Sequence, residues 1–343
     1  MTQIDTGRQR EARLESFTVS LSVSVALCTF NSALFIEDQL RSILGQSVLP
    51  AEIVISDDGS TDDTLTRVQA VFGEYRDAPI ALRVLAGEVQ LGVTRNFQRA
   101  VEACTGDLIA LSDHDDVWHF DRLSSAITAF EVEPELLLQH SDARLVDEYG
   151  DPLELSLFDA LAVSRGERDA LAEGRAFDVY LRRNLATGAT VLFRQSLLRL
   201  ALPFPIEWVH DEWLAIVAAA VGRVGFIDQE LIDYRQHSGN EIGVEKPTLR
   251  YRVKRALQPR GTRYDDLAVR SRVLANRLQL LSVDDRMLQR VREKARFENV
   301  RAALPPRRLA RLGTVFREYQ NGSYERYSSQ RNLDVFRDLL QPV

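Results

Sequence analysis

The chain has 343 residues, of which 45% are hydrophobic, and its formal net charge is -7. This length fits one large domain, or one domain with an accessory region. The negative charge excludes a protein that binds nucleic acid through its overall field. The longest apolar run, residues 213–221, is much shorter than the about 20 residues that a membrane-spanning helix needs.

Two features of the sequence bear on its compartment. Residues 1–15 are polar and charged, without the apolar core of a signal peptide, and we expect 1–18 to be a flexible tail. The two cysteines, Cys28 and Cys104, match neither a disulfide framework nor a zinc site. These features predict a protein of the reducing cytoplasm.

The first part of the chain alternates between strand and helix patterns. Apolar residues alternate with small polar ones over 21–27, as in a strand, and recur at helical spacing over 36–44. The same patterns predict the following further strands and helices: 52–56, 65–72, 80–85, 93–101 and 107–111. This alternation predicts an α/β fold with a mostly parallel sheet flanked by helices.

Polar loops follow the predicted strands. These loops are residues 29–31, 57–60, 90–92 and 113–116. In open sheets of this type, ligands bind at the carboxyl ends of the strands. We therefore expect the chemistry of this protein at that edge of the sheet.

The second part of the chain is less regular. It contains a predicted strand at 136–138, a helix over 208–221 that begins near His210, and a last strand over 226–234. Residues 246–263 include seven basic residues and no acidic one, and amphipathic helices are predicted beyond them. We therefore predict an α/β domain at 19–245 and a basic, mainly helical accessory region at 246–343.

The most informative motif is a group of three aspartates, Asp113, Asp115 and Asp116, directly after the apolar run 108–111. If the strand continues, Asp113 and Asp115 face one spot, because side chains on a strand have period two. Two carboxylates at one site favour a hard divalent cation such as Mg²⁺ or Mn²⁺, and hence a partner that carries phosphates. The alternative is an acidic loop that caps a helix beginning near Phe120.

The motifs of this chain resemble those of the family 2 inverting glycosyltransferases with the GT-A fold, and the bacterial rhamnosyltransferase-like members are the most similar. The resemblance covers residues 20–243, and its motifs occur in the family's order. They are CTFN at 28–31, SDDGSTD at 56–62, QLGVTRN at 90–96, LSDHDDVW at 111–118, TGAT at 187–190, HDEW at 210–213 and YRQH at 234–237.

The resemblance implies a nucleotide-sugar site at the sheet edge. Asp57 and Asp58 would hold the nucleotide, because a carboxylate can accept a hydrogen bond from the N3–H of a pyrimidine base. Taken alone, these two residues are explained equally well by a turn. The same site would include further residues from the neighbouring motifs: Thr29, Asn31, Arg95, Asp113 and His114.

Each of these further residues has a simpler alternative. Thr29 and Asn31 can cap a helix, and Arg95 can be a solvated arginine in a first helical turn. The resemblance also implies a metal cofactor, Mn²⁺ or Mg²⁺, held by residues at the aspartate motif and after the last strand: Asp113, Asp115, Asp116 and His237. Which aspartate contacts the metal directly stays open, His114 has no assigned chemistry, and a lone histidine such as His237 is more often structural.

The resemblance assigns Asp211 as the general base, with Glu212 as the second choice. A base within hydrogen-bond reach of the acceptor hydroxyl is required for direct displacement. The alternative for Asp211 is a carboxylate stabilised at a helix N-terminus by the helix dipole. On the acceptor side, the implied residues are Thr187, Gly188, Glu212 and Trp213.

The predicted reaction transfers one sugar from a pyrimidine nucleotide-sugar, with dTDP-L-rhamnose as the donor by resemblance, to a hydroxyl of a glycan or glycolipid. A processive polysaccharide synthase would carry a Gln-x-x-Arg-Trp motif, which this sequence lacks. A nucleotidyltransferase would need a glycine-rich loop after the first strand, and residues 28–32 contain no glycine. Two alternatives remain: a UDP-hexose-dependent glycosyltransferase, and a non-catalytic nucleotide-sugar binding protein on the same fold.

The basic stretch 246–263 has two interpretations. It is a solvated surface that balances the acidic remainder, or it contacts anionic lipids at the inner face of the cell membrane. The second interpretation suits an acceptor on a lipid diphosphate carrier. The sequence does not fix the oligomeric state.

Overall fold

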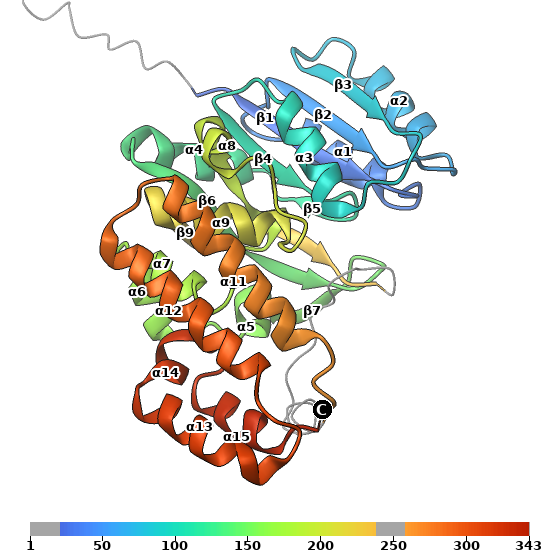
Figure 1. The fold of residues 1–343 in the computed structure, drawn as a ribbon. Coiled ribbons are helices and arrows are strands. Elements are labelled where there is room, and N and C mark those ends of the chain that lie inside the picture. The colour runs from blue at the N-terminus through green and yellow to red at the C-terminus, as the bar shows by residue number, and fades with distance from the viewer. Residues whose placement is uncertain (1–20, 238–257, 343) are drawn as a thin grey trace, which may run out of the picture.

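The computed structural model describes residues 21–237 and 258–342. In these residues the strands form one nine-stranded sheet, shown in Figure 1. Four neighbouring strands at one end of the sheet are parallel: β3 (Ala81–Ala86), β2 (Glu52–Asp57), β1 (Val23–Thr29) and β4 (Leu108–Ser112). The predicted α/β class is confirmed, and these strands lie where the sequence pattern placed them.

The other end of the sheet is mixed. The strand β8 is antiparallel to both β4 and β6, whereas β6 and β9 are parallel and β5 is antiparallel to β9. The bounds are β5 (Val117–Trp118), β6 (Leu136–Val146), β7 (Pro152–Ser156), which pairs with β6, β8 (Leu192–Arg194) and β9 (Arg223–Arg235). The predicted strands at 136–138 and 226–234 are therefore parts of the longer β6 and β9.

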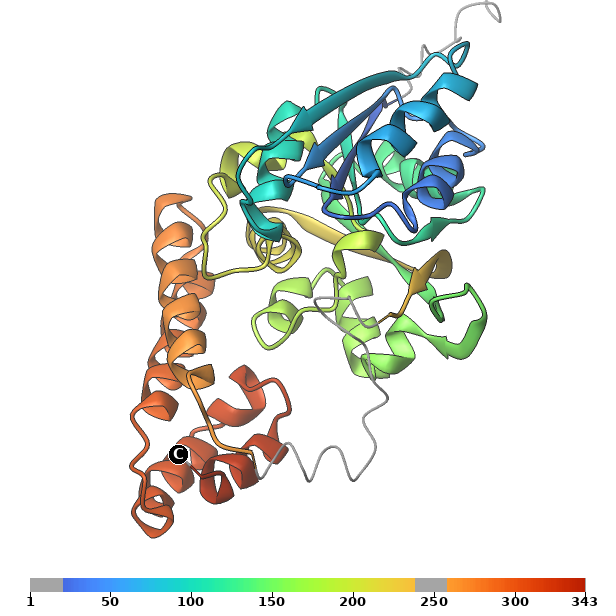
Figure 2. The same ribbon diagram turned by 90° about the vertical axis from the view of Figure 1, so that its right-hand side faces the viewer.

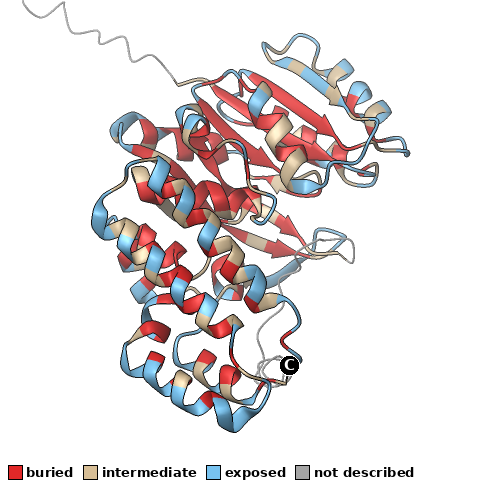
Figure 3. Ribbon diagram, in the orientation of Figure 1, coloured by how far each residue is buried: buried red, intermediate tan, exposed pale blue. Residues whose placement is uncertain are grey.

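Helices cover both faces of the sheet. Along β1, Val25 and Leu27 pack with α1, α2 and α4, whereas Ala26 and Cys28 pack with α3 and α9, because successive side chains point to opposite faces. The bounds are α1 (Ile36–Leu44), α2 (Thr64–Glu74), α3 (Val93–Ala103), α4 (Arg122–Val132) and α9 (His210–Val221). Figure 3 shows the buried sheet between these layers.

Short helices connect β7, β8 and α9. They are α5 (Leu157–Ala160), α6 (Arg165–Ala172), α7 (Ala176–Tyr180), η1 (Gly188–Thr190), η2 (Gln195–Leu197) and α8 (Leu198–Ala201). Both cysteines are buried and free. Among the described residues, no helix has both the length and the apolar character needed to cross a bilayer.

The C-terminal region is helical, as predicted. Its helices are α11 (Arg263–Leu280), α12 (Asp285–Ala302), α13 (Arg308–Gln320), α14 (Ser323–Tyr327) and α15 (Asn332–Leu340). Figures 1 and 2 show α11 and α12 side by side along one flank of the α/β domain, with the remaining three helices beyond one end. The contact is specific: Arg277 donates to the carbonyls of Leu200 and Leu202 at 2.9 Å.

Two parts of the predicted domain organisation lie outside the described residues. These are the tail 1–18 and the boundary near 245. The basic stretch is described only from residue 258 onward. In that part, the interpretation of Arg260 as a membrane contact is wrong, because its side chain is buried and donates to the carbonyls of Leu304 and Asp338.

A buried charge cluster ties the C-terminal helices together around Asp338. This carboxylate is fully buried, and Arg301 on α12 donates to it at 2.8 and 3.0 Å. The hydroxyls of Tyr264 and Tyr324 also donate to it, each at 2.7 Å. Removal of one partner from such a pair leaves an uncompensated charge in the interior.

We therefore expect Asp338→Asn to lower the free energy of unfolding by about 3 kcal/mol, since Arg301 would lose the nearest of its buried counterions and Glu298 would remain as a partner. Denaturant unfolding of the full chain measures this loss. Asp285→Asn is the matched control, because Asp285 is exposed in the first turn of α12 and its replacement should change stability by less than about 0.5 kcal/mol. Equal stability of the two variants would contradict the role of Asp338.

Candidate active site

The loop after β2 is organised by Asp57, which is buried at the end of that strand. Thr29, at the end of β1, donates to Asp57 Oδ1 at 2.7 Å, and the N–H of Ser60 donates to Oδ2 at 2.9 Å. Gly59, in the turn between Asp57 and Ser60, has φ 84°, a left-handed conformation that favours glycine. The structure thus brings Thr29 and Asp57 together, as the motifs predicted.

Asp58 connects this loop to the start of α3. Its two carboxylate oxygens accept hydrogen bonds from the N–H groups of Leu91 and Gly92, at 2.7 and 2.9 Å. The side chain is 3% exposed. A carboxylate has about four lone-pair sites, so these bonds leave each oxygen able to accept one more. The binding of a pyrimidine base by Asp57 and Asp58 stays a prediction.

Asn31 and Arg95 lie at the rim of the same edge. Asn31, in a left-handed conformation with φ 48°, accepts a hydrogen bond from the N–H of Thr61 at 2.9 Å. Arg95 donates to Gln98 on its own helix at 3.0 Å. Asn31 therefore shapes the loop rather than capping α1, and the described contacts of Arg95 leave its nucleotide role a prediction.

Sequence reasoning missed Arg99, which lies one helical turn after Arg95 on α3. Its Nε donates to Ser56 Oγ at 2.7 Å and its Nη2 donates to the carbonyl of Asp57 at 2.6 Å. Asn96 completes this network, because its amide donates to the carbonyl of Ser56 at 2.9 Å. The i, i+4 spacing of the two arginines is the signal that could have found Arg99.

The aspartate motif forms a loop. Because β4 ends at Ser112, the expectation that Asp113 and Asp115 alternate along a strand is wrong. The loop nevertheless groups the carboxylates: burial raises the pKa of Asp116 well above its usual range, and Asp115 and Asp113 raise it further. Burial also lowers the pKa of His114, which favours its neutral form.

Asp115 and Asp116 have different partners. Asp115 Oδ2 lies 2.8 Å from Nε2 of His237, which follows β9, so this predicted pair is brought together. Asp116 Oδ1 accepts a hydrogen bond from the N–H of Arg235 at 3.1 Å. Its Oδ2 is buried and has no hydrogen-bond partner among the described residues.

This donor set fits a hard divalent cation, although it does not form a finished cage. In the described part of the chain, no three His, Cys, Asp or Glu side chains converge as a ready metal site. However, carboxylate oxygen and imidazole nitrogen are ligands that Mn²⁺ accepts, and Asp115 and His237 already present one of each at contact distance. The unpartnered oxygen of Asp116 lies one residue away.

Asp211 lies at the N-terminus of α9, where both of its carboxylate oxygens accept backbone hydrogen bonds. The N–H of Gly188 donates to Oδ2 at 2.8 Å, and the N–H of Glu212 donates to Oδ1 at 2.6 Å. Burial nevertheless raises its pKa from 3.8 to about 7. A base whose pKa lies near neutrality is well matched to general-base catalysis.

The wall around Asp211 is closely packed. His210 stacks on Phe97 with ring centroids 3.9 Å apart, and burial lowers its pKa to about 3, so it stays neutral. At Gly188, a Cβ atom would lie 3.3 Å from Nε2 of His210 and 3.5 Å from Cβ of Asp211. A side chain at this position would crowd His210, and Thr187 and Gly188 directly border the predicted base.

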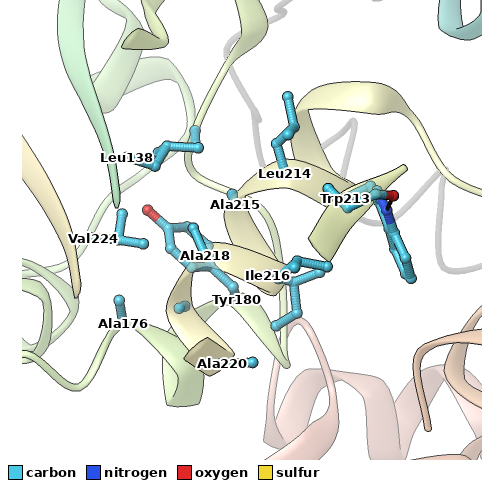
Figure 4. Close-up of a cluster of buried hydrophobic side chains, with 14 of the residues drawn as sticks. Leu138, Ala176, Tyr180, Trp213, Leu214, Ala215, Ile216, Ala218, Ala220 and Val224 are labelled. Carbon is cyan, nitrogen blue, oxygen red and sulfur yellow. Dashed lines mark hydrogen bonds between the residues drawn. The ribbon is translucent and has the colours of Figure 1, made fainter. Parts of the chain in front are cut away.

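Of the predicted acceptor-side residues, Trp213 is wrong, and Glu212 already has an ion-pair partner. Trp213 is fully buried in the cluster around α9, and its indole N–H donates to the carbonyl of Ala201 at 2.8 Å, so it cannot contact an acceptor (Figure 4). Glu212 is half-buried and forms an ion pair with Arg270 of α11. The C-terminal helices thus contact the residue next to the predicted base.

Tyr234 on β9 is influenced electrostatically by both the aspartate loop and Asp211. Burial raises the pKa of its phenol well above the usual range, and Asp116, Asp113, Asp115 and Asp211 all raise it further. The aspartate loop and Asp211 therefore lie within electrostatic range of one side chain. The predicted metal site and the predicted base therefore act on the same buried side chain.

Comparison with known proteins agrees with this geometry. The family model described as "Glycosyl transferase family 2" matches residues 24–197. The dTDP-rhamnosyl transferase RfbG of Shigella flexneri is 34% identical over 105 residues, which cover 29% of this chain and 35% of that protein. The chain spans 59% of the length of mycobacterial relatives to which it is 26% identical over 222 residues.

Two solved structures share the fold over most of the chain. S. aureus TarS 1-349 in complex with UDP has a TM-score of 0.54 at 19% identity, with 93% of this chain and 90% of that chain covered. The mannosyltransferase PcManGT from Pyrobaculum calidifontis, in complex with GDP-Man and Mn²⁺, has a TM-score of 0.52 at 19% identity, with 94% and 86% covered. The chain therefore belongs to glycosyl transferase family 2 and has a GT-A fold.

Proposed function

We propose that this glycosyltransferase transfers a single sugar, with inversion, from a pyrimidine nucleotide-sugar to a hydroxyl of a glycan or glycolipid. The observation that carries the proposal is Asp211. It is a buried carboxylate with a pKa of about 7 that accepts a hydrogen bond from the N–H of Gly188 and lies within electrostatic range of the same tyrosine, Tyr234, as the aspartate motif. That combination supplies a base at neutral pH close to a site suited to a charged leaving group.

The proposed mechanism needs only one catalytic base, Asp211. Asp211 accepts the proton of the acceptor hydroxyl as the oxygen attacks the anomeric carbon, and the nucleoside diphosphate leaves from the opposite face. One displacement inverts the anomeric configuration, and no second carboxylate is needed as a nucleophile. The backbone N–H groups of Gly188 and Glu212 hold both oxygens of the base in place.

The nucleotide would lie over the loops that Asp57 and Asp58 organise. The remaining lone pairs of Asp58 can accept from the N3–H of uracil or thymine. Both oxygens of Asp57 already accept two hydrogen bonds each from Thr29 and the turn 59–60, so Asp57, with Arg99, fixes the loop that presents Asp58. The likeness to RfbG supports dTDP-L-rhamnose as the donor. The fold shared with the UDP complex of TarS supports a UDP-hexose as the second candidate.

A divalent metal, Mn²⁺ or Mg²⁺, would be held by Asp115 with His237, with Asp113 and Asp116 beside it in the same loop. Asp115 is the better first ligand, because it already contacts His237, whereas Asp116 is almost fully buried. When bound, such a metal neutralises the charge that develops on the leaving diphosphate.

The acceptor would approach from the side of Thr187, Gly188 and Glu212. A lipid-linked acceptor would bring a cytoplasmic protein to the inner face of the membrane. There, the basic residues at 246–257 would meet anionic headgroups.

Release of nucleoside diphosphate from a donor panel tests the proposal. The panel contains dTDP-rhamnose, UDP-glucose, UDP-galactose and GDP-mannose, each with Mn²⁺ and with a chelator. We expect slow, metal-dependent hydrolysis of one pyrimidine donor without any acceptor, because water can replace the hydroxyl. Preferential turnover of GDP-mannose would contradict the assignment of a pyrimidine donor.

A further inference from the structure

A cavity of about 750 Å³ lies between the α/β domain and the C-terminal helices. One wall comes from residues 180–184, Trp208 and Glu212, and the other comes from α11, α12 and the residues that precede them. Both regions of the chain are therefore needed to form it. Glu212, an acceptor-side residue by resemblance, lines the cavity, and Arg270 of the same lining lies within electrostatic range of Asp211. The cavity therefore borders the acceptor side of the predicted site.

The charge of this cavity is opposite to that of the whole molecule. Seven of its lining residues are Arg or Lys and three are Asp or Glu, in a chain whose formal net charge is -7. Some of these cations have internal partners. Lys294 and Arg301 pair with Glu298, and Arg183 pairs with Glu167.

Two further arginines of the lining can present N–H groups to a ligand. Arg260 is 7% exposed and donates only to carbonyl oxygens, and its buried Nε has no hydrogen-bond partner among the described residues. Arg270 has Glu212 as its ion-pair partner and lies over the ring of Trp208, 4.3 Å from the centroid. A guanidinium is well suited to bind phosphate or carboxylate through paired N–H groups.

We propose that this cavity binds an oxyanion, a phosphate or a carboxylate, that is carried by the acceptor. The inference rests on the proposed function, since it assigns the acceptor class of that same site: an anionic glycan or glycolipid rather than a neutral one. In the absence of acceptor, the carboxylate of Glu212 is paired with the guanidinium of Arg270. When the acceptor binds, its oxyanion takes the place of Glu212 and positions the acceptor hydroxyl toward Asp211.

Trp208 makes the cavity observable by fluorescence. The other two tryptophans, Trp118 and Trp213, are 3% and 0% exposed and do not line the cavity. An anion that draws Arg270 away from the indole should therefore change the emission of Trp208. We would titrate the full chain separately with sn-glycerol 3-phosphate, with glucuronate and with glycerol as the neutral probe, in the absence of donor and metal.

The expected result is a saturable change with one charged probe and none with glycerol. Whichever charged probe binds identifies the oxyanion as phosphate or carboxylate, and Trp208→Phe should abolish the signal. Arg270→Gln should weaken binding by about tenfold or more, the loss expected for one charge-assisted hydrogen bond. Glu212→Gln should strengthen it, because the competing carboxylate is removed, and this opposite sign would not result from misfolding.

Arg272→Gln is the matched control, because Arg272 lies on the same helix two residues away, is exposed and does not line the cavity. It should bind the anion as the wild type does. No saturable change with either charged probe, or an equal loss in Arg272→Gln, would overturn the inference. Since neither nucleotide nor metal is present, this failure is distinct from a failure of the proposed function, which the donor panel reports.

Discussion

Replacing Asp211 with asparagine is expected to lower the rate of sugar transfer by about 10²–10⁴-fold, the usual contribution of a general base. The amide is nearly isosteric, and its oxygen can still accept one of the two backbone hydrogen bonds that Asp211 accepts, the one from Gly188, so the loop should keep its shape. Asp265→Asn is the matched control, because Asp265 is also in the first turn of a helix but is exposed. A steady-state assay should find that control close to wild-type activity.

The pH dependence follows from the pKa of Asp211, about 7. The base must be ionised, so kcat/KM should rise with pH through about 7 and level off above it. Stability should move in the opposite direction. The folded protein holds this proton more tightly than the unfolded chain, whose aspartate pKa is near 3.8, so ionisation of the buried group destabilises the fold as pH rises toward 7.

Asp211→Asn should remove the loss of stability that ionisation of the buried carboxylate causes. Its stability advantage over the wild type should be absent near pH 4 and grow as pH rises to 8. Denaturant unfolding at several pH values measures the difference. An activity profile that is flat between pH 5 and 8, or a variant that transfers sugar at the wild-type rate, would exclude Asp211 as the base.

The second large effect is expected at Asp115. In the wild type, Mn²⁺ together with dTDP or UDP should raise the melting temperature, because a ligand present at 100 times its Kd stabilises the native state by about 2.7 kcal/mol. Asp115→Asn removes the carboxylate charge that contacts His237 and should abolish the metal-dependent part of this shift. Differential scanning calorimetry with and without a chelator measures it.

Asp77→Asn is the control for this experiment, because Asp77 lies in an exposed turn between α2 and β3. It should keep the full metal-dependent shift. If Asp115→Asn also kept it, the metal would bind elsewhere, and Asp116 would be the next residue to replace.

The parallel half of the sheet could be predicted from the sequence because its signals are local. Strands β1, β2 and β4 are buried on both faces, and β1 and β2 are each followed by a helix whose apolar spacing is visible within a few residues. The mixed half could not be predicted. The pairing of β6 with β9 and of β5 with β9 depends on contacts between segments far apart in the chain.

The motif assigns Trp213 to the acceptor side, although the sequence around it predicts burial. The helix that contains it is apolar on nearly every side over 213–221, which is typical of a helix inside the core rather than on the surface. For Arg270, in contrast, the sequence contains no signal that could have predicted its position. It is 58 residues from its partner Glu212, and no local pattern connects a basic residue on α11 to the predicted base.

The measurement that tests the central claim most directly is calorimetric titration of the full chain with dTDP, UDP and GDP, each with Mn²⁺ or with a chelator. It needs no acceptor and no knowledge of the sugar. We expect dTDP or UDP to bind in the presence of Mn²⁺, at least about tenfold more weakly with the chelator, and GDP to bind more weakly than either. Failure of both pyrimidine nucleotides to bind, or a preference for GDP, would contradict the proposed use of a pyrimidine nucleotide-sugar at the sheet edge formed by Asp57, Asp58 and Asp115.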